Sequence, residues 1–294
     1  MLPAGLATVA TVGRMTGAGW SAAVRRAMSS EAGGGGPRGM RLDEETVRKL
    51  KSGELPPLDF DLLHDIVDVV GEAIVSDELG DRFREAGAAP GVALTERWHM
   101  VQGLYAMAEE LVLKEFELEG MDGRARYTAS MHMYVLGDDD HVQIQAPEEV
   151  RAAAAEAARA LRKVLDRNWN ILLKTVGIDT DALPDSFTLD EVKAVLDECK
   201  IRVDAPPVKD QLVALGRDAD LSSDDWQRAL AFDIMQPLHM SVVSEKHGLA
   251  GEEGYVLSQY CSRHVAGHPQ VAVLNMELQQ AAMVHLETGL KSRE

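Results

Sequence analysis

The segment PEEVRAAAAEAARALRKVLDRNWNILLKTVG, residues 147–177, carries the strongest secondary-structure signal in the chain. Pro147 suits the first turn of a helix, where its missing N–H needs no partner, and the two acids after it match the helix dipole. Good helix formers fill the middle, and Gly177 ends the pattern. The segment predicts a long helix and, with its neighbours, an all-α multi-helix bundle.

Apolar residues at helical spacing predict further helices on both sides of this segment. Steps of three and four residues run through 59–75, through a long helix after Thr95, and through 269–290. Thr95 is expected to be the N-cap of its helix because a Thr hydroxyl accepts hydrogen bonds from the first free N–H groups. These segments place helices along most of the chain.

Three segments give weaker signals. Residues 79–91 are expected to wind down into a loop, and 127–136, YTASMHMYVL, to form a short apolar piece. VQIQ at 142–145 is too short to anchor a sheet alone. No sheet is therefore predicted.

Charge is distributed unevenly along the 294 residues. Residues 1–30 contain Arg14, Arg25 and Arg26 and no acid, whereas the remainder carries 27 basic and 48 acidic residues. An acid-free start rich in Arg, Ser and Ala is typical of a mitochondrial transit peptide; a disordered arm and a chloroplast transit peptide are the alternatives. Residues 31–42 follow as a Gly-rich flexible linker. The predicted location is the mitochondrial matrix or the matrix face of the inner membrane.

The composition excludes several classes of function. The acidic body lacks the basic patch that nucleic-acid binding needs. No run of apolar residues is long enough for a transmembrane segment, although a peripheral position at the inner membrane is compatible with the sequence. Cys199 and Cys261 give no disulfide framework. No P-loop, nucleophile elbow or ordered triad is found, so no enzyme is predicted.

Residues 179–192, DTDALPDSFTLDEV, place acids ahead of a helix in the manner of a calcium loop. Phe187 would take the apolar loop position, and Thr188 a following ligand position. Pro184, however, stands near the turn that a Gly should make, and the loop is one residue too long. The candidate calcium ligands are Asp179, Asp181, Asp185 and Glu191.

A second loop, RDADLSSDDWQRAL at 217–230, follows at a suitable distance, and its apolar residue Leu221 lies 34 residues after Phe187. Residues 160–240 therefore resemble an EF-hand pair, a calmodulin-type lobe with degenerate loops. The resemblance implies paired helices that contact a partner, with calcium at the first loop as the alternative. An ordinary helical hairpin with capped helices is the competing interpretation.

Two further patterns contain metal-binding residue types. Cys261, His264 and His268 have the spacing C-x2-H-x3-H and are candidate zinc ligands, although His near a helix C-terminus is also favoured by the helix dipole. Glu96 and His99 form one half of a di-iron helix pattern. No second such pair lies on a convincing helix.

Two functions from different classes follow. The first is a non-catalytic, matrix-side accessory subunit of a respiratory complex or the ATP synthase, contacting other protein subunits through its helical lobe. The second is a calcium-responsive mitochondrial regulator with its site at 179–191, and a metalloenzyme at the Cys/His cluster is a third hypothesis. The expected organisation is a transit peptide at 1–30, a linker at 31–42, an N-terminal helical region at 43–146, the EF-hand-like lobe at 147–240 and C-terminal helices at 241–294.

Overall fold

The computed structural model of the protein describes residues 48–49, 54–56, 58–135, 148–218, 225–266 and 268–292. The predicted transit peptide and linker lie outside these residues, as do VQIQ at 142–145 and most of the second predicted loop, including Leu221. In the described part every regular element is a helix and none is a strand, which confirms the all-α prediction.

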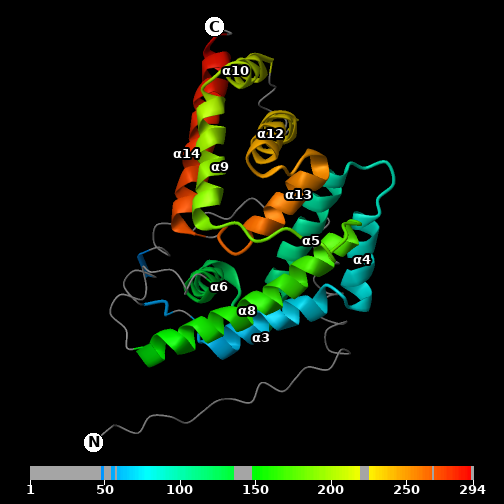
Figure 1. The fold of residues 1–294 in the computed structure, drawn as a ribbon, viewed down its shortest axis with the longest axis vertical. Helices are drawn as coiled ribbons and strands as arrows, with labels where there is room; N and C mark the ends of the chain where they lie inside the picture. The colour runs from blue at the N-terminus through cyan, green and yellow to red at the C-terminus, as the bar shows by residue number, and fades with distance from the viewer. Residues whose placement is uncertain are drawn as a thin grey trace, which may run out of the picture.

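Figure 1 shows how the described helices are arranged. In chain order they are α3 (Phe60–Ala73), α4 (Asp77–Gly87), α5 (Leu94–Glu115), α6 (Gly120–Val135), α8 (Glu148–Thr175), α9 (Leu189–Val203), α10 (Val208–Asp218), α11 (Asp225–Arg228), the π-helix η1 (Ala229–Met235), α12 (Gln236–His247), α13 (Gly251–Ser262) and α14 (Pro269–Lys291). The long helix expected after residue 147 is α8, and the expected last helix is α14. None of the described helices has the length and apolar character to cross a membrane.

The segment expected to wind down into a loop contains a helix, α4, so that prediction is wrong. Leu79, Phe83 and Ala86 recur at helical spacing and are buried. Their burial against the neighbouring helices stabilises a segment whose other residues are mostly polar. The helical spacing of these apolar residues is present in the sequence, but the segment is short and the pattern is therefore weak.

Two helix boundaries also differ from expectation. Residues 127–135 are the second half of α6 rather than a separate piece. α5 begins at Leu94, so Thr95 lies inside the first turn, where it is buried and is not the N-cap. The free N–H of Thr95 instead donates to the Glu252 carboxylate of α13 at 3.3 Å. Tertiary packing, not a local cap, sets this helix start.

Helices α3, α4, α5, α6 and α8 share one hydrophobic core, to which α13 contributes its inner face. Trp98 of α5 is completely buried, with its ring centroid 5.7 Å from that of Trp169 on α8. α3 and α8 approach closely at Gly71, where a Cβ would overlap the Asn168 side chain. The Asn168 amide donates to the carbonyl of Val67 at 2.9 Å. This buried hydrogen bond fixes the two helices in register.

Helices α9, α10, η1, α12 and α14 form a second hydrophobic core. α10 and α14 pack against each other through two glycines. A Cβ at Gly216 would overlap the carbonyl oxygen of Leu286, and one at Gly289 would overlap the carbonyl oxygen of Val213. Only the absence of side chains at these two positions lets the backbones come so close.

The two cores meet around α13 and the connection between α8 and α9 (Figure 1). The Asp166 carboxylate of α8 accepts a hydrogen bond from Arg263 at 2.7 Å and lies 2.8 Å from His264 Nε2. The Phe187 N–H donates to the Cys261 carbonyl at 2.8 Å. α8 packs in the first core and α9 in the second, so the helices flanking the candidate calcium loop belong to different cores.

Candidate functional site

The candidate calcium ligands Asp179, Asp181, Asp185 and Glu191 are all exposed. Asp179 Oδ1 accepts a hydrogen bond from the Asp181 N–H at 2.9 Å, which closes a turn. The Glu191 carboxylate accepts from the N–H and the hydroxyl of Thr188, each at 2.8 Å, in a capping box at the start of α9. These hydrogen bonds lower the pKa of Glu191. In this loop Asp179 stabilises a turn and Glu191 caps the start of α9.

The candidate zinc ligands have separate surroundings at the junction of the cores. The Cys261 thiol is buried and lies 4.0 Å from the Pro184 carbonyl oxygen. His268 precedes α14, and its Nδ1 accepts from the Gln270 N–H at 3.2 Å. His264 contacts the α8 carboxylate described above. In the described part of the chain no three His, Cys, Asp or Glu side chains are grouped so that they could hold a metal ion.

The carboxylate between α8 and α13 is an ionic contact rather than a reactive group. Burial alone would raise the pKa of Asp166, but hydrogen bonds from His264 and Arg263 outweigh it and lower the pKa. The guanidinium of Arg263 also stacks 3.7 Å from the ring centroid of Tyr260. The contacts of Asp166 with Arg263 and His264, and the stacking of Arg263 on Tyr260, fix the end of α13 against α8.

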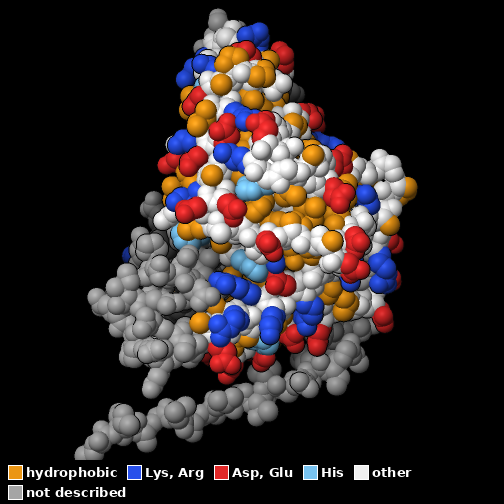
Figure 2. Space-filling model, in the orientation of Figure 1, with side chains coloured by type: hydrophobic (Ala, Val, Ile, Leu, Met, Phe, Trp, Pro, Cys, Tyr) orange, Lys and Arg blue, Asp and Glu red, His pale blue; other side chains and the backbone are white. Residues whose placement is uncertain are grey.

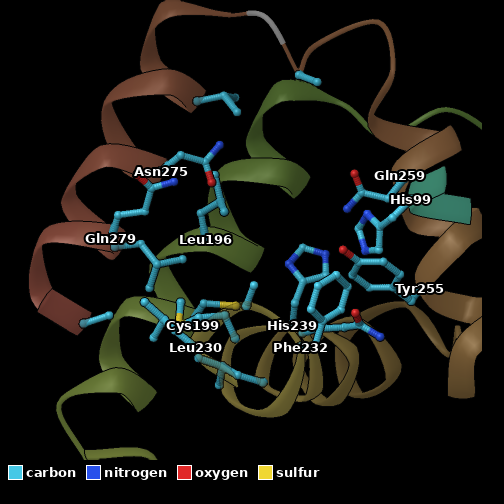
Figure 3. A pocket seen from close by; sticks show the side chains of 18 of the residues that line it. His99, Leu196, Cys199, Leu230, Phe232, His239, Tyr255, Gln259, Asn275 and Gln279 are labelled. Carbon is cyan, nitrogen blue, oxygen red and sulfur yellow. The ribbon is translucent and has the colours of Figure 1, made fainter. Parts of the chain in front are cut away.

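A cavity of about 840 Å³ lies between the second core and the helices α5 and α13 of the first. Six side chains from α9, α12 and α14 make a buried aliphatic wall: Val192, Leu196, Leu238, Val271, Leu278 and Ala282. Gln227, Asn275 and Gln279 also line it and are exposed, so they mark its mouth. The side chains of Leu196, Cys199 and Leu230 lie between the α14 amides and the rings at the other end (Figure 3).

Four rings from four helices form one end of this cavity. They are His99 of α5, Phe232 of η1, His239 of α12 and Tyr255 of α13. The His99 centroid lies 5.3 Å from that of Phe232 and 5.9 Å from that of Tyr255, and the His239 centroid lies 5.6 Å from that of Tyr255. The contacts of His99 with Phe232 and of His239 with Tyr255 are edge-to-face, an arrangement that is favourable for aromatic rings. The four rings fix one another's positions and give this end of the cavity an aromatic surface.

The ionisable rings of the cavity are neutral at neutral pH. Burial lowers the pKa of His99, against the smaller opposing influence of the Gln236 and Gln102 amides. Burial lowers the pKa of His239 to about 4 and raises that of Tyr255 to about 12. A neutral imidazole has one nitrogen that donates and one that accepts. The ring end therefore offers hydrogen bonds without charge.

Formal charge is lacking from the cavity wall as a whole. None of the described residues that line it is Asp, Glu, Lys or Arg, although 27% of the chain is charged. Figure 2 shows hydrophobic side chains gathered near the middle of one face, with acidic and basic side chains mixed over the rest of it. Burial also raises the pKa of Cys199 in this wall to about 12, so its thiol keeps its proton.

The π-helix η1 supplies part of the cavity wall. The ring of Pro237, just after it, would clash with the carbonyl of Asp233 in a regular α-helix. A wider turn relieves that clash, and the Gln236 N–H bonds to the carbonyl of Ala231, five residues earlier. Turns of this kind are frequent at functional sites because they redirect side chains. Here the turn directs Phe232 to the ring end.

Comparison with known proteins assigns no family to this chain. No protein-family model matches it, and neither the curated proteins nor the solved structures give a match. The geometry and chemistry of the cavity are therefore the basis for a functional proposal.

Of the candidate metal-binding residues in the sequence, only His99 lines the cavity, and the sequence pattern indicated a different chemistry for it. Its E-x-x-H partner Glu96 points elsewhere and pairs with Arg228 at 3.3 Å. His239 and Tyr255 carried no pattern that linked them. Pro237 within an otherwise helical pattern was the one available signal, because a Pro there requires an irregular turn.

Proposed function

We propose that this protein binds a neutral, largely apolar small molecule in the cavity between its two cores. The observation that carries the proposal is the uncharged wall formed by the described lining residues. A charged ligand would lose its hydration there without gaining an ionic partner. An apolar ligand gains about 25 cal/mol for each Å² removed from water. The volume of about 840 Å³ suits such a molecule.

The role proposed for this site is binding rather than catalysis. The neutral histidines and Tyr255 have no carboxylate partner among the described lining residues that would prepare one of them for proton transfer. The setting that we propose is the mitochondrial matrix or the matrix face of the inner membrane, as the acid-free N-terminal residues indicate. In that setting the protein would hold a lipid-soluble molecule away from water.

A fluorescent neutral probe, N-phenylnaphthylamine, tests the proposal because its emission rises in apolar surroundings. We expect saturable binding of one probe per chain. Ala282→Phe, which fills the buried wall, and Ala231→Trp, which obstructs the exposed mouth, should each weaken binding at least about tenfold. Val284→Phe is the matched control, since Val284 is exposed on α14 and does not line the cavity. Unsaturable binding, or equal binding by all four proteins, would refute the site.

A second function, contact with other protein subunits, is favoured by a separate observation on α14. Val273, Met276 and Val284 are exposed large hydrophobic residues at helical spacing on this helix. Met adapts readily to a partner surface, and a partner would remove this apolar stripe from water. The proposed partner class is another subunit of a respiratory complex or the ATP synthase, and α14 (Pro269–Lys291), which follows the EF-hand-like lobe predicted for residues 147–240, supplies this contact.

Native electrophoresis of mitochondria tests this second function. The chain should migrate with a large complex, and Met276→Asp combined with Val273→Asp should release it. Glu287→Ala on the same helix is the control, because it changes an exposed polar residue instead. Migration of the wild-type chain only as a free monomer would rule out the subunit role.

A further inference from the structure

The four rings at one end of the cavity indicate which class of neutral ligand it would bind. This inference rests on the proposed function. We infer that the cavity accepts a neutral phenol or hydroquinone that carries an aliphatic substituent. Its ring would lie against His99, His239 and Tyr255, and its aliphatic part along α9 and α14. Each half of the ligand would match one half of the wall.

The four rings favour a planar aromatic group over a flexible chain. Tyr255 contacts both histidine rings, and Phe232 contacts His99. The Tyr255 side chain is buried, whereas the Phe232 side chain is partly exposed at the ring end. A ligand ring entering beside Phe232 meets aromatic faces and edges at once, and such contacts add to simple burial. A saturated chain would gain only the burial.

One hydrogen-bonding group at this end points to a hydroxyl on the ligand. The Gln236 side-chain oxygen is buried and forms no hydrogen bond of normal geometry with the described residues, although the amide lies near enough to His99 to raise the pKa of that ring. The Gln236 nitrogen makes only a long contact of 3.9 Å to the sulfur of Met240. A buried acceptor without a partner is costly, and a hydroxyl proton would satisfy it. His99 beside it can donate to the same hydroxyl oxygen.

The rest of the cavity wall disfavours a fatty acid, whose carboxylate is charged, and has room for an uncharged alkyl chain. A fatty-acid carboxylate would find no Lys or Arg among the described lining residues. Leu196 and Leu230 continue from the ring end toward α14, which adds Leu278 to the wall. The amides of Asn275 and Gln279 lie beyond them at the exposed mouth, where water is available. An alkyl chain of moderate length would therefore lie along the leucines.

Four probes that differ by one chemical feature test this ligand class by calorimetry on the full chain. Para-octylphenol has the ring, the hydroxyl and the chain; para-octylanisole lacks the hydroxyl proton, dodecanol lacks the ring, and dodecanoate adds a charge. We expect para-octylphenol to bind at least about tenfold more tightly than each of the others. Gln236→Met, which keeps the length but removes the amide, should bring para-octylphenol and para-octylanisole to similar affinities. Gln280→Met, at an exposed position of α14 outside the cavity lining, should preserve the preference.

The outcomes separate the two levels of the proposal. If dodecanol binds as tightly as para-octylphenol, or if Gln236→Met keeps the preference for the hydroxyl, the ligand class is wrong while a neutral cavity site stands. If none of the four binds and N-phenylnaphthylamine also fails to bind, the cavity function itself fails. Tight binding of dodecanoate would contradict both the proposed ligand class and the proposal that the cavity binds neutral molecules.

Discussion

His239 of α12 and Tyr255 of α13 meet edge to face, with ring centroids 5.6 Å apart and planes at 85°. Tyr255 belongs to the first hydrophobic core, and α12 belongs to the second. The contact therefore joins the two cores at the cavity. Burial there keeps His239 neutral, with a pKa of about 4.

This burial predicts a pH dependence of stability. The folded chain leaves His239 unprotonated down to about pH 4, whereas the unfolded chain protonates it near its ordinary value of 6.5. The unfolded state thus binds more protons in this window, so the free energy of unfolding falls as the pH is lowered from 6.5 toward 4. His239→Phe should show a shallower fall in urea denaturation at a series of pH values. Parallel curves for the two proteins would show that His239 is not buried neutral.

Glu109 of α5 should act in the opposite direction. Burial raises its pKa to about 7, and Tyr127 of α6 donates a hydrogen bond to it at 3.0 Å. The folded state keeps this proton above the ordinary value of 4.5, so stability is lost as the pH rises from 4.5 through about 7. Glu109→Gln should then be more stable than the wild type near pH ~8, by on the order of 1–2 kcal/mol. Thermal unfolding at both ends of this range measures it.

The neighbouring acid provides the control for that experiment. Glu110 is exposed and pairs with Arg124 on the surface. Exposed pairs contribute about 0–1 kcal/mol, so Glu110→Gln should change little at either pH. An equal response of the two variants would mean that net charge, rather than burial of Glu109, causes the effect.

The contact of α10 with α14 predicts a penalty for alanine at Gly216. Gly→Ala inside a helix usually stabilises by about 1 kcal/mol. Here the new methyl group would overlap the Leu286 carbonyl oxygen, and separating the helices should cost about 2 kcal/mol or more. Gly80→Ala is the comparison, because its Cβ would lie 3.3 Å from the Val75 backbone and needs only a small adjustment. Chemical denaturation would contradict the packing if Gly216→Ala were the more stable variant.

The capping box at the start of α9 separates a structural role of the 179–191 loop from calcium binding. Thr188→Ala removes the cap and should lower the free energy of unfolding by about 1 kcal/mol. Calcium should leave the melting temperature of the wild type unchanged, because Glu191 is engaged with Thr188. A saturable increase with calcium that Glu191→Gln abolishes would instead establish the calcium-responsive regulator.

The sequence was informative where local signals decide the structure. The Ala-rich segment after Pro147 forms α8, and the apolar spacing after residue 269 appears as α14. Phe187, predicted at the apolar position of a calcium loop, has its ring centroid 4.2 Å from that of His247, and its place in such a loop stays a prediction. The second predicted loop lies mostly outside the described residues, so its pairing with the first loop stays a prediction.

The cavity could not be predicted because no short stretch contains it. Its rings come from positions 99, 232, 239 and 255, and its aliphatic wall comes from α9, α12 and α14. Only the packing of the two cores brings them together. The shifted pKa values have the same origin, because burial, not a neighbouring residue in the chain, is their largest cause. The sequence spacing of Cys261 and His264 is typical of metal ligands, but in the fold Cys261 contacts the Pro184 carbonyl and His264 contacts Asp166.

Methyl NMR of labelled methionine offers the most direct measurement of the binding site. Met235 and Met283 line the cavity, whereas Met276 is exposed outside it on α14. On titration with para-octylphenol, the Met235 and Met283 signals should shift together and saturate at one molecule per chain, while the Met276 signal stays in place. Unchanged Met235 and Met283 signals, or a shift of Met276 alone, would contradict binding in the cavity.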